Sequence, residues 1–242
     1  ADAQLPSSSM QHQLLLHQQL YPENTAYNEP VSIALDFPLT QPIAHAALQA
    51  LVRRHAVLRT YYAFDARAAA FHQVVLPEDG CSVQLACCLA ADAWSDVLDR
   101  ELRTPFDLLA APPIRAIMRE AEPPWLVINV HHVAADMEAM TIMRDELAQH
   151  CSALALHCPP PSLSPIEFEY ADFALWEHAR ARDDGMALSW WLLQLNGAPE
   201  TMDLPLDRPR PNVQATAGSH HALHLDRGLT GHVMALCASA GA

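Results

Sequence analysis

Two histidines and an aspartate follow an apolar segment of this chain within six residues. The apolar segment covers residues 125–130 (WLVINV), and residues 131–136 (HHVAAD) come directly after it. Apolar strands usually end in turn residues such as Gly, Asn or Pro. Three titratable side chains at a strand end therefore favour acid–base chemistry. The alternative is a chance adjacency of structural histidines, because the chain contains 14 of them.

The two histidines are not expected to bind one metal ion together. Adjacent side chains of an extended chain point to opposite faces, so His131 and His132 could share an ion only if a turn separated them. The same alternation leaves one histidine of the pair to face a substrate. The sequence therefore predicts a site without a metal.

The composition is that of a globular protein. The chain has 242 residues, 51% of them hydrophobic, which is enough for one or two domains with a buried core. Acidic residues outnumber basic ones by 28 to 14, and the net charge of −14 argues against general binding of nucleic acid or anionic membranes. No apolar run approaches the ~18 residues that span a bilayer, and we find no secretory signal, so a cytoplasmic location is expected by default.

The cysteines predict neither a disulfide framework nor a zinc site. They form no C-x-x-C pair, and their spacing is not that of a small disulfide-rich domain. We expect reduced thiols at Cys81, Cys87, Cys88, Cys151, Cys158 and Cys237.

Hydrophobic periodicity predicts an α/β fold with a mixed sheet. Helices are expected at 10–20, 43–54, 93–102, 137–153, 170–194 and 229–242, the first of them after the cap candidates at 7–9. Strands are expected at 31–37, 58–64, 71–76, 82–86, 114–119, 125–130 and 219–225. The proline-rich segment 158–165 is the clearest linker, and a second proline-rich segment covers 204–211.

Four segments, in the same order along the chain, resemble motifs of the condensation domains of nonribosomal peptide synthetases. Residues 131–136 are similar to the family's HHxxxDG motif, and residues 54–60 (RHAVLRT) to its RHxxLRT motif. Residues 170–176 (YADFALW) resemble its YxDFAxW segment, and residues 204–211 (LPLDRPRP) its LPxDRPRP segment. Each motif is weak alone, but their collinear order over most of the chain makes the resemblance strong.

The resemblance implies a chloramphenicol-acetyltransferase-like α/β sandwich with a mixed, mostly antiparallel sheet and flanking helices. Complete condensation domains contain two such halves, with the His motif in a tunnel between them. Residues 1–165 would form the first half, and residues 166–242 the connecting helix and the start of the second. Residues 27–28 (YN) and 105–108 (PFDL) fit the family as well. We therefore expect the chain to be a fragment of a larger protein.

The resemblance also implies amide-bond formation between two thioesters held by upstream and downstream carrier proteins or adjacent synthetase domains. No cofactor would be bound, because the phosphopantetheine arms belong to the carriers. His132 would face the tunnel, as a general base or as a group that holds the amine. His131 would be structural, and Asp136 would pair with an arginine. The arginine candidates are Arg59 first, then Arg54 and Arg208.

The remaining motif residues are expected to form the framework of the fold. For the helix that carries Tyr170, Asp172 and Trp176, packing against the core is favoured over catalysis, because aromatic residues at helical spacing usually serve burial. Arg208 and Arg210 would lie at a bend between the two halves.

One residue departs from the family pattern. Met137 stands where the HHxxxDG motif has its glycine. Glycine permits close backbone approach and leaves its amide accessible, whereas a methionine side chain changes that space. Two alternatives therefore stay open: a non-catalytic, condensation-like domain that recruits partners, and a stand-alone acyltransferase of the same fold that uses a soluble acyl thioester such as a coenzyme A ester.

Overall fold

The computed structural model describes residues 5–88, 94–120, 123–181, 185–212 and 221–241. The chain divides into two compact units, Ala1–Asp203 and Leu204–Ala242. The first unit contains the sheets and the His motif. The described part of the second unit is extended chain followed by helix α7 (Arg227–Ala240), which Asp226 caps at its start.

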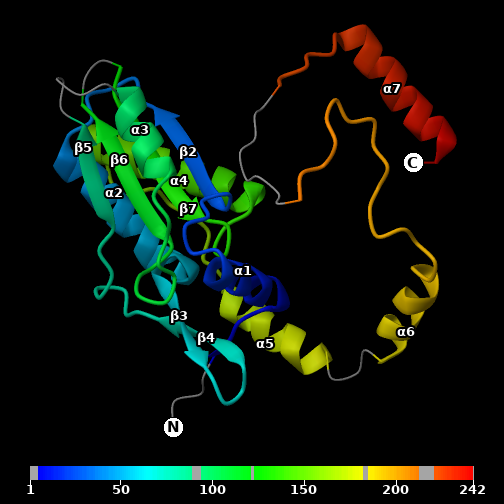
Figure 1. Cartoon of the computed structure of the whole chain (residues 1–242). Coiled ribbons are helices and arrows are strands. Elements are labelled where there is room, and N and C mark those ends of the chain that lie inside the picture. The colour runs from blue at the N-terminus through cyan, green and yellow to red at the C-terminus, as the bar shows by residue number, and fades with distance from the viewer. Residues whose placement is uncertain (1–4, 89–93, 121–122, 182–184, 213–220, 242) are drawn as a thin grey trace. The chain divides into compact units, whose positions relative to one another are not determined.

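A four-stranded sheet carries the His motif at the end of one of its two inner strands (Figure 1). Its order is β2 (Asn28–Ala34), β7 (Trp125–His131), β6 (Ile114–Arg119) and β5 (Gln84–Cys88). The β2–β7 and β7–β6 pairs are antiparallel, and the β5–β6 pair is parallel. Every residue of β7 after Trp125 is buried, as the unbroken apolar sequence requires of a strand covered on both faces.

A smaller sheet packs into the same core. It has the order β1 (Leu5–Pro6), β4 (Ala70–Val75) and β3 (Thr60–Asp65), with both pairs antiparallel. Tyr62 of β3 and Phe71 of β4 are fully buried and belong to one hydrophobic cluster with side chains of the larger sheet. The first unit therefore has a single core that both sheets share.

Helices flank the larger sheet. Helix α2 (Gln41–Arg54) packs against α4 (Met137–Ala155), α4 contacts β2, and α3 (Trp94–Leu102) contacts β6. In Figure 1, α3 lies in front of the sheet and α2 behind it. The remaining helices of the first unit are α1 (Ser9–Leu20), a short 3-10 helix (Ala56–Arg59), α5 (Tyr170–Ala181) and α6 (Gly185–Gln194).

The first helix begins at a reciprocal cap. Ser8 precedes α1, and its Oγ accepts a hydrogen bond from the Gln11 backbone amide, at 3.2 Å. In return, the Ser8 amide donates to Oε1 of Gln11, at 3.0 Å. This capping box satisfies two amides that a helix start would otherwise leave unpaired, and it selects Ser8 from the three cap candidates at 7–9.

A buried ionic cluster joins α2 to α4. Nε of Arg54 donates to Oε1 of Glu146, at 3.0 Å, and Nε2 of His55 donates to Oε2, at 2.7 Å. Arg54 also donates to the carbonyl oxygen of Ser164, at 2.6 Å. The Arg-His pair of the RHxxLRT-like segment thus neutralises a carboxylate that is only 7% exposed.

The predicted α/β class, with a mixed and mostly antiparallel sheet flanked by helices, is confirmed. The strand prediction at 114–119 matches β6, and the prediction at 125–130 is one residue shorter than β7. The strand predicted at 31–37 corresponds to β2, which lies three residues earlier, at Asn28–Ala34. The division at residue 165 stays a prediction.

Two element predictions are wrong. The helix expected over 170–194 is two helices, α5 and α6, with residues 182–184 between them outside the described part. Its periodic aromatic residues suggested one helix, but every described residue of α6 is exposed, so the core does not hold the two segments in line. The strand expected at 219–225 is not formed over 221–225, and 219–220 are outside the described residues. A strand needs a partner for its backbone groups, and none of the strand pairs includes this segment.

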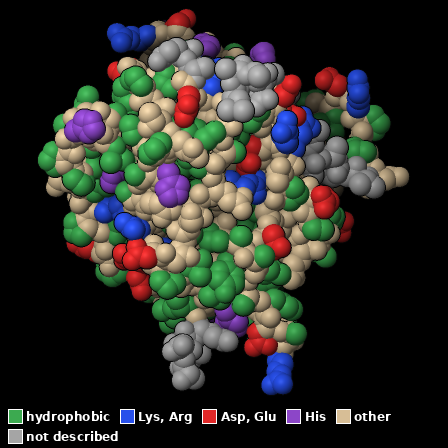
Figure 2. All heavy atoms as spheres, turned by 90° about the vertical axis from the view of Figure 1, so that its left-hand side faces the viewer, with side chains coloured by type: hydrophobic (Ala, Val, Ile, Leu, Met, Phe, Trp, Pro, Cys, Tyr) green, Lys and Arg blue, Asp and Glu red, His purple; other side chains and the backbone are tan. Residues whose placement is uncertain are grey.

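The surface is consistent with a chain of negative net charge. On the face shown in Figure 2, the basic side chains that are coloured lie scattered among acidic ones. Among the described helices, none is long and apolar enough to cross a membrane.

Replacing Glu146 with glutamine should lower the free energy of unfolding by about 2 kcal/mol, because Arg54 and His55 would lose the charged acceptor of their hydrogen bonds at this buried position. The control is Asp79→Asn, which removes the exposed pair between Asp79 and Arg53 and should cost less than about 1 kcal/mol. Urea unfolding measures both. Equal losses for the two variants would contradict a special role of the buried cluster.

Candidate active site

The His motif forms a tight turn between β7 and α4. His131 ends the strand, and its amide donates to the Pro113 carbonyl, at 2.9 Å. The next amide, of His132, donates to the Tyr27 carbonyl, at 2.8 Å, and the Ala134 amide donates back to the His131 carbonyl, at 2.9 Å. Both histidines are thus fixed through their backbones to neighbouring segments.

His131 is part of the core, with 1% of its surface exposed. Its Nδ1 accepts a hydrogen bond from the Val133 amide, at 3.0 Å, and its ring lies 6.1 Å from that of Tyr27 and 5.9 Å from that of Phe106. Burial lowers the pKa of His131 to about 4, and the nearby His132 and His17 contribute to this shift. The ring is therefore neutral at pH 7, with its proton on Nε2.

His132 is half-buried and holds the opposite tautomer. Its Nδ1 lies 2.6 Å from the carbonyl oxygen of Ala135. A carbonyl can only accept, so Nδ1 carries the proton and Nε2 of the neutral ring keeps its lone pair. The ring stacks on Tyr27, with 6.2 Å between centroids and 10° between planes. The arrangement suits Nε2 to accept a proton from a bound molecule.

Asp136 begins α4 and serves as its N-cap. Its Oδ1 accepts from the Ala139 amide, at 2.8 Å, and the side chain is exposed. The expected ion pair with Arg59 or Arg54 is wrong. The helix start satisfies the carboxylate, through a backbone amide and the positive end of the helix dipole, without an arginine.

Two of the predicted arginine partners, Arg59 and Arg54, bind other groups. Arg59 donates to the carbonyl of Leu76, which directly follows β4, and Arg54 pairs with Glu146. Arg208 and Arg210 belong to the second unit, where both are exposed, and the pair of Asp136 with Arg208 stays a prediction.

Helix α5 holds the other motif residues. The hydroxyl of Tyr170 shares a hydrogen bond with Ser8 Oγ, at 3.0 Å, and Asp172 Oδ2 accepts from the Glu169 amide, at 2.9 Å. Trp176 is 55% exposed and carries Arg180 over its ring, 5.4 Å from the centroid. Ala174 is the residue of α5 that the core encloses fully. The predicted packing against the core therefore holds for the face of α5 that carries Ala174. Trp176 lies on a different, exposed face.

Met137 is the first residue of α4, and its side chain is 86% exposed. It extends away from the core of the first unit. The Met137 side chain therefore neither fills the turn nor displaces His132 within this unit.

Two buried polar residues escaped the sequence reasoning, Gln11 beside the His motif and Glu146 beside Arg54 and His55. Gln11 contacts the turn after His132, and Glu146 anchors the Arg-His pair. The serine followed three residues later by a glutamine is a capping-box pattern that could have pointed to Gln11. For Glu146, the signal was an acidic residue among the regularly spaced apolar positions of the helix predicted at 137–153.

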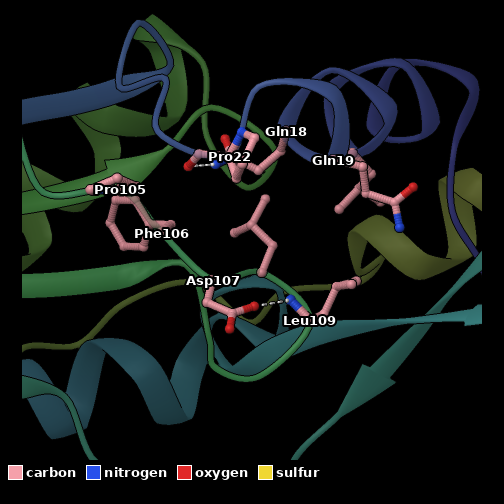
Figure 3. Close-up of a pocket in the computed structure, with 9 residues that line it drawn as sticks. Gln18, Gln19, Pro22, Pro105, Phe106, Asp107 and Leu109 are labelled. Carbon is pink, nitrogen blue, oxygen red and sulfur yellow. Dashed lines mark hydrogen bonds between the residues drawn. The ribbon is translucent and has the colours of Figure 1, made fainter.

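A cavity of about 330 Å³ lies between α1 and the loop that follows α3. Figure 3 shows Phe106 on one side and Gln18 and Gln19 of α1 on another. Phe106 also contacts His131, but His132 is not one of the lining residues. Among the residues that the structure describes, no group of His, Cys, Asp and Glu side chains is arranged to hold a metal ion.

Comparison with known families gives a match over almost the whole chain. The model of the condensation domain family matches residues 2–242. The chain belongs to the condensation domain family. The recognition made from the four motifs is thereby confirmed.

The relatives of this condensation domain chain are much longer synthetases. Tyrocidine synthase 2 of Brevibacillus parabrevis is 32% identical over 233 residues, which cover 94% of this chain and 6% of that protein. Phosphinothricin tripeptide synthetase PhsC of Streptomyces viridochromogenes is 32% identical over 250 residues, covering 100% of this chain and 23% of that protein.

Solved structures share the fold. The X-domain in complex with OxyB from teicoplanin biosynthesis superposes with a TM-score of 0.81 at 26% identity, over 100% of this chain and 54% of that chain. The first condensation domain of the calcium-dependent antibiotic synthetase gives 0.67 at 18% identity, over 82% and 49% of the two chains. The chain thus spans about half of these solved domains.

Stability should fall as the pH is lowered from about 6.5 to about 4. The unfolded chain protonates His131 near its ordinary pKa of 6.5, whereas the folded chain resists this down to about 4. The unfolded state therefore binds the extra proton in this window, which favours unfolding by up to about 3 kcal/mol. In His131→Asn, whose side-chain oxygen can replace Nδ1, urea unfolding should show this much less dependence on pH. An unchanged dependence would contradict the assignment.

Asp136→Ala should lower stability by about 1 kcal/mol through the lost cap. Asp136→Ser should recover most of this loss, because a hydroxyl also caps a helix but cannot form an ion pair. Thermal unfolding of the three proteins provides the comparison. If serine is as damaging as alanine, Asp136 acts through its charge.

Proposed function

We propose that this chain forms part of a condensation domain that joins two carrier-bound substrates through an amide bond. The amine nitrogen of an aminoacyl thioester would bond to the carbonyl carbon of an acyl or peptidyl thioester. The carbon–sulfur bond of the donor then breaks, its thiol leaves, and the amine loses a proton. Because a thioester is already activated, the site mainly has to orient both substrates and accept that proton.

The observation that carries the proposal is the free Nε2 of His132. The Ala135 carbonyl holds Nδ1 in its protonated form, and Tyr27 supports the ring face. A half-buried imidazole fixed in this way can take a proton from an attacking amine, or accept its hydrogen bond, without first changing tautomer. His131, buried and bonded to Val133, supports the turn instead.

The substrates would arrive on phosphopantetheine arms of carrier proteins or adjacent synthetase domains. The great length of the related synthetases supports such partners. The exposure of Met137 removes one objection to activity, because the methionine leaves the turn around His132 intact. Its side chain would then border the substrate space and shape the room beside the acceptor.

A second candidate is recruitment of a partner protein without catalysis. The X-domain that superposes over the whole chain was solved in complex with OxyB. The likeness to that domain is greater in TM-score and in coverage of this chain than the likeness to the condensation domain of the calcium-dependent antibiotic synthetase. The recruiting function would need the same turn only as structure.

His132→Ala should reduce dipeptide formation at least about 100-fold, because it removes the proton acceptor. The test uses the complete natural protein with matched donor-loaded and acceptor-loaded carrier proteins, and intact mass spectrometry detects the product. The control is His45→Ala, which removes an exposed histidine of α2 and should leave the rate unchanged.

Two results would count against catalysis by His132. Undiminished product in His132→Ala would exclude its role as proton acceptor. Failure of the wild-type protein with every matched carrier pair, together with binding of a second protein that survives His132→Ala, would favour recruitment.

A further inference from the structure

Gln11 is a buried polar residue beside the His132 turn that the proposed reaction has not used. It lies on α1 and is 1% exposed. Its Nε2 donates to the Tyr62 hydroxyl, at 2.9 Å, and to the Val133 carbonyl, at a longer 3.4 Å. Its Oε1 accepts from the Ser8 amide, at 3.0 Å. An amide thus reaches from the start of α1 into the turn.

The partners of Gln11 fix the orientation of its side-chain amide. The Val133 carbonyl can only accept and the Ser8 amide can only donate, so the nitrogen must face the turn and the oxygen must face the helix start. Burial raises the pKa of Tyr62 far above its ordinary value, so its hydroxyl stays neutral. No other side chain of similar length supplies both a donor and an acceptor at these places.

The hydrogen bond from Gln11 to Val133 restrains the backbone that also positions His132. Val133 follows His132, and Ala135 supplies the carbonyl that holds Nδ1 of His132. The Val133 amide is bound to His131, and its carbonyl is bound to Gln11. Both backbone groups of Val133, the residue after His132, are therefore hydrogen-bonded to side chains.

We propose that Gln11 is a positioning residue that holds the turn so that the Ala135 carbonyl keeps His132 in its reactive tautomer. The inference rests on the proposed condensation reaction. Gln11 itself touches neither His132 nor a substrate, and it acts through the backbone of residues 133–135.

Helix α5 is hydrogen-bonded to the start of α1, and these bonds help to fix the position of Gln11. His178 Nε2 donates to the Ser7 carbonyl, at 2.8 Å, and Tyr170 shares a hydrogen bond with Ser8 Oγ. The Ser9 amide donates to Glu177 Oε2, at 2.7 Å. Figure 1 shows α1 and α5 side by side. The chain of contacts from Tyr170 through Ser8 and Gln11 to Val133 gives the YxDFAxW-like segment a role at a distance from the reaction.

The test compares Gln11→Glu and Gln11→Met with a matched control in the complete natural protein. Burial favours the neutral carboxyl of glutamate, which keeps the shape and an acceptor but has one donor hydrogen, so it cannot serve both Tyr62 and Val133. Methionine keeps the volume but has neither an N–H donor nor a comparable acceptor. Gln13→Glu makes the same chemical change at an exposed position of α1. Steady-state rates with loaded carrier proteins give kcat and KM, and amide hydrogen exchange by mass spectrometry reports on residues 131–136.

Both Gln11 variants should lower kcat about 10- to 100-fold with KM changed by less than about twofold, because a displaced reacting group affects the chemical step. Amide exchange at 131–136 should become faster in both variants. Gln13→Glu should match the wild type in all three measurements. Tyr170→Phe, which leaves Gln11 in place, should lower kcat about fivefold through the single lost hydrogen bond.

Wild-type kcat in Gln11→Met, or a loss that arises from KM alone, would overturn the positioning role. If Gln11→Met does not fold, Gln11→Glu and Tyr170→Phe decide, and wild-type kcat in both would overturn it. An inactive wild-type protein would count against the condensation reaction, and the exchange rates would then still decide whether Gln11 holds the turn: unchanged exchange would refute it.

Discussion

The backbone of β7 is hydrogen-bonded to β2 on one side and to β6 on the other, and this pairing determines where the two histidines can lie. His131 is still part of the strand, so its ring is enclosed by the core. His132 is the first residue beyond the strand and turns its ring to the Ala135 carbonyl. Adjacent residues of the same type therefore carry their protons on different nitrogens, because the backbone groups beside them differ.

The strong local signals made most of the larger sheet and its helices predictable. The apolar run of β7 and the hydrophobic periodicity of α2 and α4 predicted that these elements are buried. The order of the four motifs along the chain was enough to indicate the family. Side-chain alternation predicted that one histidine of the pair would face a substrate, and the resemblance to condensation domains assigned the structural role to His131.

The failures arise where a residue's partner is distant in sequence or belongs to the backbone. The resemblance implied an arginine partner for Asp136, but its carboxylate accepts from an amide three residues along the helix. Helix α6 has the apolar composition of a buried helix, yet all its residues are exposed. Gln11 contacts a residue 122 positions away, and no local pattern encodes such a contact. Sequence patterns thus describe the elements better than the polar contacts between them.

The contacts between α5 and residues 7–9 also have a consequence for the order of folding. Ser9 and Glu177 are 168 residues apart, and a contact across so long a loop forms late, because the entropy of closing it must be met first. A ribosome makes α1 before α5, so residues 7–9 lack Tyr170, Glu177 and His178 until α5 has emerged. Of these two helices, the one that is synthesised earlier is therefore fixed in place late.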